Sequence, residues 1–149
     1  MQPFTANAHR LLQLFHAMRE VKPGSAIQRL QALHLSMSHT RLMHVLAPDH
    51  SLPMKDLADA LGLTPPSVTA LTRRLVQNNM VQREADASDS RVVLLSLTDE
   101  GRALLRDVYQ QHLADMERLL HGLTSEEQEQ FLGLMERAVS ALRESTTDV

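Results

Sequence analysis

The 149-residue sequence contains no cysteine and no tryptophan, and only three phenylalanines and one tyrosine. Without cysteine, the chain has no disulfide, no thiolate metal ligand, no cysteine nucleophile and no thiol for an oxidant to modify. No apolar run approaches the ~20 residues of a membrane-spanning helix. The start, MQPFTANAHR, lacks the basic-then-apolar order of a signal peptide. These absences predict a cytoplasmic protein with no membrane partner.

The sequence also lacks the groupings of residues on which enzymes rely. Eight histidines are many for this length, but His9 and His16 are seven positions apart, and His39 and His44 are five apart, so neither pair has the spacing of an HExxH motif. A zinc site needs three or four converging ligands, and we recognise no nucleophile with its base and no paired carboxylates. We therefore predict no metal, no cofactor and no enzymatic activity.

Charge is distributed unevenly along the chain. The net charge is −3, yet residues 1–97 carry ten basic against seven acidic residues, and residues 98–149 carry five against eleven. This asymmetry is compatible with a basic face that meets an anion such as nucleic acid, and equally with ordinary solvated surface. With 43% hydrophobic residues, the chain is globular, and its length predicts a single domain over residues 1–149.

Apolar residues recur at helical spacing in most of the chain. They predict helices over about 4–21 and over about 98–144, the latter interrupted at Gly122. Between them, a short helix over 54–61 ends at Gly62, and a second begins after Thr64 with Pro65 in its first position, where a missing N–H is tolerated. Two short helices joined by a tight turn form a helix-turn-helix at about 53–76.

After the second of these helices, the repeat of apolar residues changes from 3.6 residues, typical of a helix, to two residues, typical of a strand. MVQREA and RVVLLSL predict two strands, and the polar stretch DASDS, residues 86–90, predicts the loop between them. A β-hairpin directly after a helix-turn-helix is a wing, so the fold class is mainly α with a small β-hairpin wing. The winged helix spans about 36–97, and the predicted helical segments flank it on both sides.

The second helix of this motif is the candidate for nucleic-acid recognition. With Val68, Leu71 and Leu75 turned inward, its outer face carries six residues that can reach base edges or phosphates in a major groove ~12 Å wide. They are Pro66, Ser67, Thr69, Ala70, Arg73 and Arg74. The wing tip, with Asp89, Ser90 and Arg91, can reach the minor groove. The alternative for the two helix arginines is a solvated face with local ion pairs.

These segments resemble the MarR family of bacterial transcriptional regulators. The resemblance lies in DLADALGLTPPSVTALTRRL, then MVQRE, DSR and LTDEGR, in the family's order and spacing. It implies a homodimer whose dimerisation helices are those over about 4–21 and about 98–144. It also implies that this dimer represses nearby genes by binding double-stranded DNA at a pseudo-palindromic operator. It also implies release by a small aromatic or anionic effector. Within this resemblance, Arg91 corresponds to the wing arginine of the family's Asp-x-Arg motif, and Asp89 to its acidic partner.

The chain departs from the family pattern at three positions. Asn79 stands where glycine is usual, and asparagine is the next best residue for a left-handed turn. Ser90 replaces a residue that is often basic, which weakens attraction to the minor groove. Arg73 stands where an acidic residue is common, which strengthens phosphate binding or alters the preferred DNA sequence.

The effector site is predicted from the family's habit of binding ligands between the dimer helices and the DNA-binding lobe. The candidate lining residues are Phe15, Met18, Met37, Met43 and Tyr109. Membership of the hydrophobic core is the alternative for each of them. The alternative for the whole protein is a winged-helix module that contacts other proteins and has no sequence-specific DNA binding.

Overall fold

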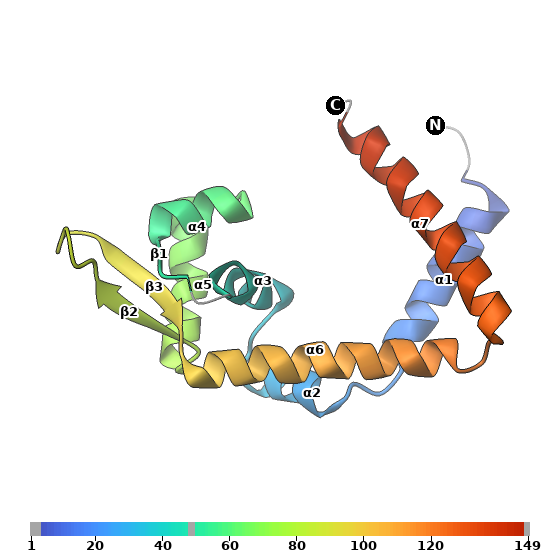
Figure 1. Ribbon diagram of the computed structural model, residues 1–149, viewed down its shortest axis with the longest axis horizontal. Helices are drawn as coiled ribbons and strands as arrows, with labels where there is room; N and C mark the ends of the chain where they lie inside the picture. Colours follow the sequence, from blue (N-terminus) through green and yellow to red (C-terminus); the bar gives the residue numbers. More distant parts are fainter. Residues whose placement is uncertain (1–3, 48–49, 148–149) are drawn as a thin grey trace. The chain divides into compact units, whose positions relative to one another are not determined.

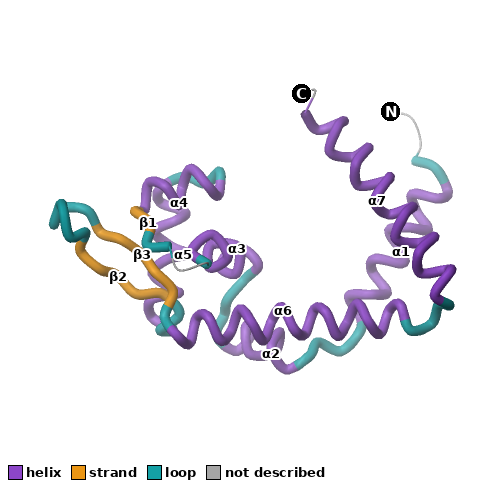
Figure 2. Tube along the Cα trace, in the orientation of Figure 1, coloured by secondary structure: helices purple, strands orange, loops and turns teal. Residues whose placement is uncertain are grey.

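The computed structural model describes residues 4–47 and 50–147. These residues form helices and three short strands (Figure 1, Figure 2). The elements are α1 (Ala6–Glu20), α2 (Ser25–Ala32), α3 (Met37–Leu46), β1 (Leu52–Pro53), α4 (Met54–Leu61), α5 (Pro65–Gln77), β2 (Val81–Ala85), β3 (Val93–Leu97), α6 (Asp99–Leu120) and α7 (Ser125–Thr147). The predicted class, mainly α with a small β wing, is confirmed.

The chain divides into two compact units, with the boundary inside α6 between Gln111 and His112. The first unit holds α1 to α5, the sheet and most of α6. The second holds the end of α6 and all of α7. Among the described residues, no helix combines the length and the apolar character needed to span a bilayer.

The core of the first unit lies where α3, α4, α5, β3 and α6 converge. Its fully buried side chains are Leu42, Met43, Leu46, Leu57, Val68, Leu75, Leu95 and Leu104. Burying an aliphatic side chain of this size contributes roughly 1.5–3 kcal/mol. Because α5 supplies Val68, Thr72 and Leu75 to this core, the helix is held at a fixed rotation about its axis.

The turn between α4 and α5 forms as the sequence predicts. Gly62 adopts φ 63°, the left-handed conformation that glycine reaches without steric cost, and Leu63 N–H donates to Ala58 O at 3.1 Å. Pro65 occupies the first position of α5. The Thr64 hydroxyl does not bond a backbone N–H of α5 and instead bonds the Ser67 hydroxyl at 2.9 Å.

The sheet has one strand more than the sequence predicts. β2 and β3 pair antiparallel with Val81 opposite Leu97 and Ala85 opposite Val93, which confirms the wing. Leu52 and Pro53, just before the predicted helix over 54–61, form the extra strand and pair with Leu95 and Leu94 of β3. Two residues are too few to show a period-2 pattern in the sequence, so this edge strand can be recognised only from its pairing with β3.

The base of the wing is joined closely to the start of α6. Asn79 adopts φ 56°, as expected for asparagine in a left-handed turn, and its carbonyl accepts a 2.6 Å hydrogen bond from the Thr98 hydroxyl. The Thr98 hydroxyl also caps α6 by accepting from Gly101 N–H at 3.0 Å. A Cβ at Gly101 would lie 2.1 Å from Met80 O, so only glycine permits this approach.

The start of α3 depends on a histidine. Ser36 N–H donates to His39 Nδ1 at 3.0 Å, and the Ser36 side chain accepts from the backbone N–H of His39, which together form a capping box. The Ser36 hydroxyl also lies 2.9 Å from His39 Nδ1. The pKa of His39 is lowered from its ordinary 6.5, first by burial and then by the positive charge of Arg74. The neutral imidazole is therefore the form that the folded protein stabilises, because only unprotonated Nδ1 accepts the bond from Ser36.

We expect His39 to make folding stability depend on pH. Its pKa in the folded state lies below the unfolded value, so its contribution is complete above about pH 6.5 and is lost as the pH falls through the folded pKa. In His39→Gln, the side-chain amide oxygen can accept from Ser36 N–H without titrating. Urea unfolding at about pH 7.5 and about pH 5 should show a smaller acid-induced loss of stability in the variant. An equal loss in both proteins would contradict this role.

Candidate nucleic-acid interface

The outer face of α5 is fully open to solvent. Pro66, Ser67, Thr69, Ala70, Arg73 and Arg74 are all exposed, as is Pro65 at the start of the helix. The opposite side of the same helix carries the completely buried Val68 and Leu75. Because the inner face is anchored in the core, the outer face forms a rigid convex ridge of the kind that fits a major groove.

Two hydroxyls on this face are engaged within the protein. Thr69 Oγ1 donates to Pro65 O at 2.9 Å, and Ser67 Oγ bonds Thr64 Oγ1 at 2.9 Å. The Thr69 proton is therefore used inside the helix, and its oxygen keeps only acceptor capacity. The arginines are left as the charged hydrogen-bond donors of this face.

The two arginines of α5 occupy different sides of the helix. At 100° per residue, Arg73 lies opposite the buried stripe, whereas Arg74 lies on the side facing the start of α3. There its charge lowers the pKa of His39. The exposed Gln77, four residues after Arg73, continues the same ridge. Sequence reasoning missed Gln77, although its spacing from Arg73 would have identified it.

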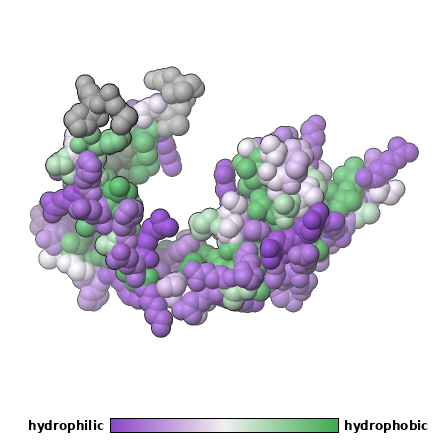
Figure 3. Space-filling view, turned by 180° about the vertical axis from the view of Figure 1, so that it is seen from behind, coloured by the Kyte–Doolittle hydropathy of each residue, from purple (hydrophilic) through white to green (hydrophobic). Residues whose placement is uncertain are grey.

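The wing tip is a closely hydrogen-bonded loop between β2 and β3. Asp86 Oδ1 accepts from Ser88 N–H at 2.8 Å, from Ser88 Oγ at 2.5 Å and from Asp89 N–H at 2.9 Å. These bonds, led by the one from the Ser88 hydroxyl, lower the pKa of Asp86. Asp89, Ser90 and Arg91 are exposed at this tip, where hydrophilic side chains project at the right of Figure 3.

Asp89 contacts Arg91 through the backbone. Its Oδ1 accepts from Arg91 N–H at 3.0 Å, which turns the chain just before β3. The side chain of Arg91 is exposed to solvent. The structure thus places Asp89, Ser90 and Arg91 together at the wing tip and gives Asp89 a backbone-holding role there.

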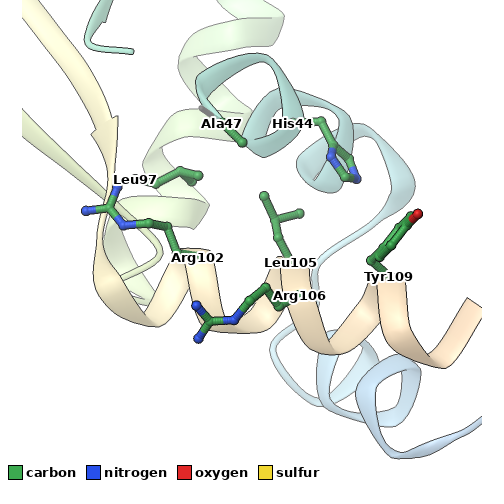
Figure 4. Close-up of a pocket in the computed structure, with 7 residues that line it drawn as sticks. All are labelled: His44, Ala47, Leu97, Arg102, Leu105, Arg106 and Tyr109. Atoms are coloured by element: carbon green, nitrogen blue, oxygen red, sulfur yellow. The ribbon is translucent and has the colours of Figure 1, made fainter. Parts of the chain in front are cut away.

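A cavity of about 350 Å³ lies between α3, the end of β3 and α6. Its lining residues are His44, Ala47, Leu97, Arg102, Leu105, Arg106 and Tyr109. In Figure 4, Leu105 rises from α6 toward α3, and the rings of His44 and Tyr109 lie on the same side of it. Arg102 pairs with Asp99 at 3.4 Å, and Arg106 is exposed. The cavity therefore has an apolar floor, and cationic and aromatic side chains surround its opening.

The structure gathers only one of the predicted effector-binding residues at this cavity, namely Tyr109. Phe15 and Met18 are exposed on α1, and Met37 is exposed at the start of α3. Met43 is completely buried in the core. His44, Arg102 and Arg106, which line the cavity, were missed because they come from two helices far apart in sequence.

Residues with metal-binding chemistry do not cluster in the described ranges 4–47 and 50–147. No group of three or more histidine, aspartate or glutamate side chains is arranged there to hold a metal ion.

Solved structures similar to this chain come from bacteria. YusO from Bacillus subtilis is 26% identical, with a TM-score of 0.78, over 93% of this chain and 99% of that chain. S. aureus MepR in a DNA complex is 25% identical, with a TM-score of 0.75, over 91% and 98%. S. aureus MepR bound to ethidium bromide is 26% identical, with a TM-score of 0.68, over 93% and 97%.

A family model matches the segment that contains the helix-turn-helix and most of the wing. The matched residues, 35–93, run from the start of α3 to the beginning of β3, and the model is that of the MarR family. Residues 35–93 thus match the MarR family, and the chain is similar over nearly its whole length to the structures of YusO and MepR.

Proposed function

We propose that the protein is a homodimeric, sequence-specific DNA-binding repressor of nearby genes, released from DNA by a small effector. The observation that carries this proposal is the rigid, solvent-facing ridge of α5 beside a wing tipped by Arg91. A similar protein, S. aureus MepR, has been solved in complex with DNA. The negative net charge does not oppose this function, because the basic residues of α5 and the wing lie on exposed faces.

Each DNA contact follows from the chemistry of the exposed side chain. Arg73 can donate two hydrogen bonds to guanine, while Pro66 and Ala70 offer small apolar surfaces to a thymine methyl. Ser67 contacts base or phosphate, and Thr69, whose proton is donated to Pro65 O, accepts from the amino group of a base. The amino end of α5, beginning at Pro65, favours a phosphate. Arg74, on the α3 side, contacts the phosphate backbone.

The wing supplies the second set of contacts. Arg91, preceded by Asp89 and Ser90, enters the minor groove, where narrow A·T-rich tracts concentrate negative potential. With Ser90 in place of a basic residue, Arg91 is the cation of the tip. Its removal should therefore cost most of the wing's contribution to binding.

The dimer is proposed from apolar surface that a single chain leaves exposed. In the second unit, α7 exposes Phe131, Leu132, Leu134, Met135, Val139 and Leu142. In the first unit, α1 buries none of its residues and exposes Leu11, Leu12, Leu14, Phe15 and Met18. A second copy that covers these faces would place two α5 helices on half-sites about 34 Å apart, so the operator is pseudo-palindromic.

Effector binding is assigned to the cavity beside α6. Its apolar floor, with the guanidinium of Arg106 and the ring of Tyr109 at the rim, suits a small aromatic anion. The cavity borders α3, which packs on α5, so a ligand that displaces α3 changes the placement of the recognition helix.

We expect Arg73→Ala and Arg91→Ala each to weaken binding to the operator by about 1–3 kcal/mol, or roughly fivefold to 150-fold. The salt dependence of binding should become shallower by about one unit of slope for each phosphate that the variant no longer neutralises. Fluorescence anisotropy on a labelled operator measures both effects. Lys22→Ala, which removes a positive charge outside these faces, is the control and should bind as the wild type does.

Unchanged binding in the Arg73→Ala/Arg91→Ala double variant would reject this DNA-binding face. Failure of the wild type to bind any duplex at low salt, with the dimer intact, would favour a winged helix that contacts only proteins.

For the effector site, we expect benzoate, a simple aromatic carboxylate, to release the wild type from DNA. Arg106→Ala should require about tenfold more benzoate, the equivalent of roughly 1.4 kcal/mol, because it loses the charge-assisted contact to the carboxylate. Its affinity for DNA without benzoate should be unchanged. Benzamide, which has the same ring and no charge, is the control. Equal sensitivity of the variant and the wild type to benzoate would refute the assignment of Arg106.

A further inference from the structure

We propose that Asp86 is a positioning residue of the wing, whose carboxylate holds the loop that presents Arg91 to DNA. The proposal rests on the proposed function, because it assumes that the wing meets DNA. Asp86 directly follows β2, five residues before Arg91, and it is partly covered whereas the tip residues that follow it are exposed.

One oxygen of Asp86 organises the first half of the loop. Oδ1 accepts from two backbone N–H groups, those of Ser88 and Asp89, and from the Ser88 hydroxyl, at 2.5–2.9 Å. Hydrogen bonds to an ionised acceptor are stronger than those between neutral groups. In agreement, the same three bonds lower the pKa of the carboxyl, so Asp86 is ionised at neutral pH.

The carboxylate of Asp89 connects the loop that Asp86 organises to the backbone of Arg91. Asp86 fixes the backbone of Asp89, and Asp89 Oδ1 in turn accepts from Arg91 N–H at 3.0 Å. Two backbone bonds close the loop, from Asp86 N–H to Val92 O at 3.0 Å and from Val92 N–H to Asp89 O at 2.9 Å. The backbone at Arg91 is thereby set before any DNA arrives, which reduces the ordering cost of binding.

The negative charge of Asp86 makes it possible to distinguish a carboxylate that holds the loop from one that only lies near the DNA. A carboxylate near the DNA backbone repels phosphates, so removing one that does nothing else should strengthen binding. Removing a carboxylate that holds the loop should weaken binding, because Arg91 must then be ordered on the DNA. The two roles therefore predict opposite effects of the same substitution.

The test is a double-mutant cycle between Asp86→Ala and Arg91→Ala, read by anisotropy on a labelled operator duplex. We expect Asp86→Ala to raise the Kd about tenfold in the wild-type background and less than about threefold in the Arg91→Ala background. Glu84→Ala is the matched control. It removes a neighbouring exposed carboxylate on β2 that bonds Gln82 and none of the loop residues, so its Kd should be equal to the wild-type value or lower.

A measurement without DNA tests the same loop independently. In Asp86→Ala, amide hydrogen exchange at Ser88, Asp89 and Arg91 should be faster, while exchange within α5 and the thermal unfolding midpoint stay at their wild-type values. Asp86→Asn keeps an acceptor oxygen without the charge, so it should bind DNA better than Asp86→Ala does.

Three results would overturn the positioning role: a lower or unchanged Kd for Asp86→Ala, an equal rise in Kd in both backgrounds, or unchanged exchange at Arg91. Failure of the proposed function has a different signature. If Arg91→Ala itself binds like the wild type, the wing does not contact DNA, and the positioning proposal falls with that assignment. A normal loss of affinity in Arg91→Ala without coupling to Asp86 rejects the positioning role alone.

Discussion

The close approach between Met80 and the first turn of α6 is the contact on which the DNA-facing elements depend. Four chain segments converge there: the end of α5, the start of β2, the end of β3 and the start of α6. Thr98 ties them together, because its N–H donates to Met80 O at 3.1 Å and its hydroxyl donates to Asn79 O. Gly101 lets the backbones approach, since any Cβ there would meet Met80 O.

This junction gives the recognition helix and the wing a common base. The inner face of α5 is fixed by Val68 and Leu75, and the hairpin leaves the end of that helix through the left-handed turn at Asn79. The ridge of α5 and the tip of the wing are therefore mounted on one rigid support. A rigid support matters for DNA recognition, because α5 and the wing must contact adjacent grooves at the same time. If either had to become ordered on binding, the lost conformational entropy would reduce affinity.

Much of this arrangement follows from local sequence signals. Gly62 marks the end of α4 and Pro65 marks the start of α5. The change of period after Asn79 marks the wing, and the return to helical spacing at about residue 98 marks α6. Each signal is strong because it concerns residues only a few positions apart, where helix period, caps and turn chemistry act directly. The outer face of α5 could be predicted for the same reason, since fixing Val68 and Leu75 inward determines what points outward.

The features that the sequence did not reveal depend on contacts between distant segments. β1 is two residues long and is defined only by its pairing with β3. The cavity brings His44 of α3 to Arg106 and Tyr109 of α6, about sixty positions later, and no periodicity links them. In the sequence, Asp86 is one polar residue in a polar loop, because its role lies in the donors that the folded loop turns toward it.

Recognition of a specific DNA sequence by the ridge of α5 and the wing is tested most directly by an anisotropy titration of the purified wild-type protein at two salt concentrations. One labelled duplex would carry the promoter of its own or the adjacent gene, and a second would carry the same bases scrambled. We expect tight binding to the promoter that weakens steeply with salt, and much weaker binding to the scrambled duplex. Equal, weak binding to both duplexes at low salt would contradict sequence-specific recognition.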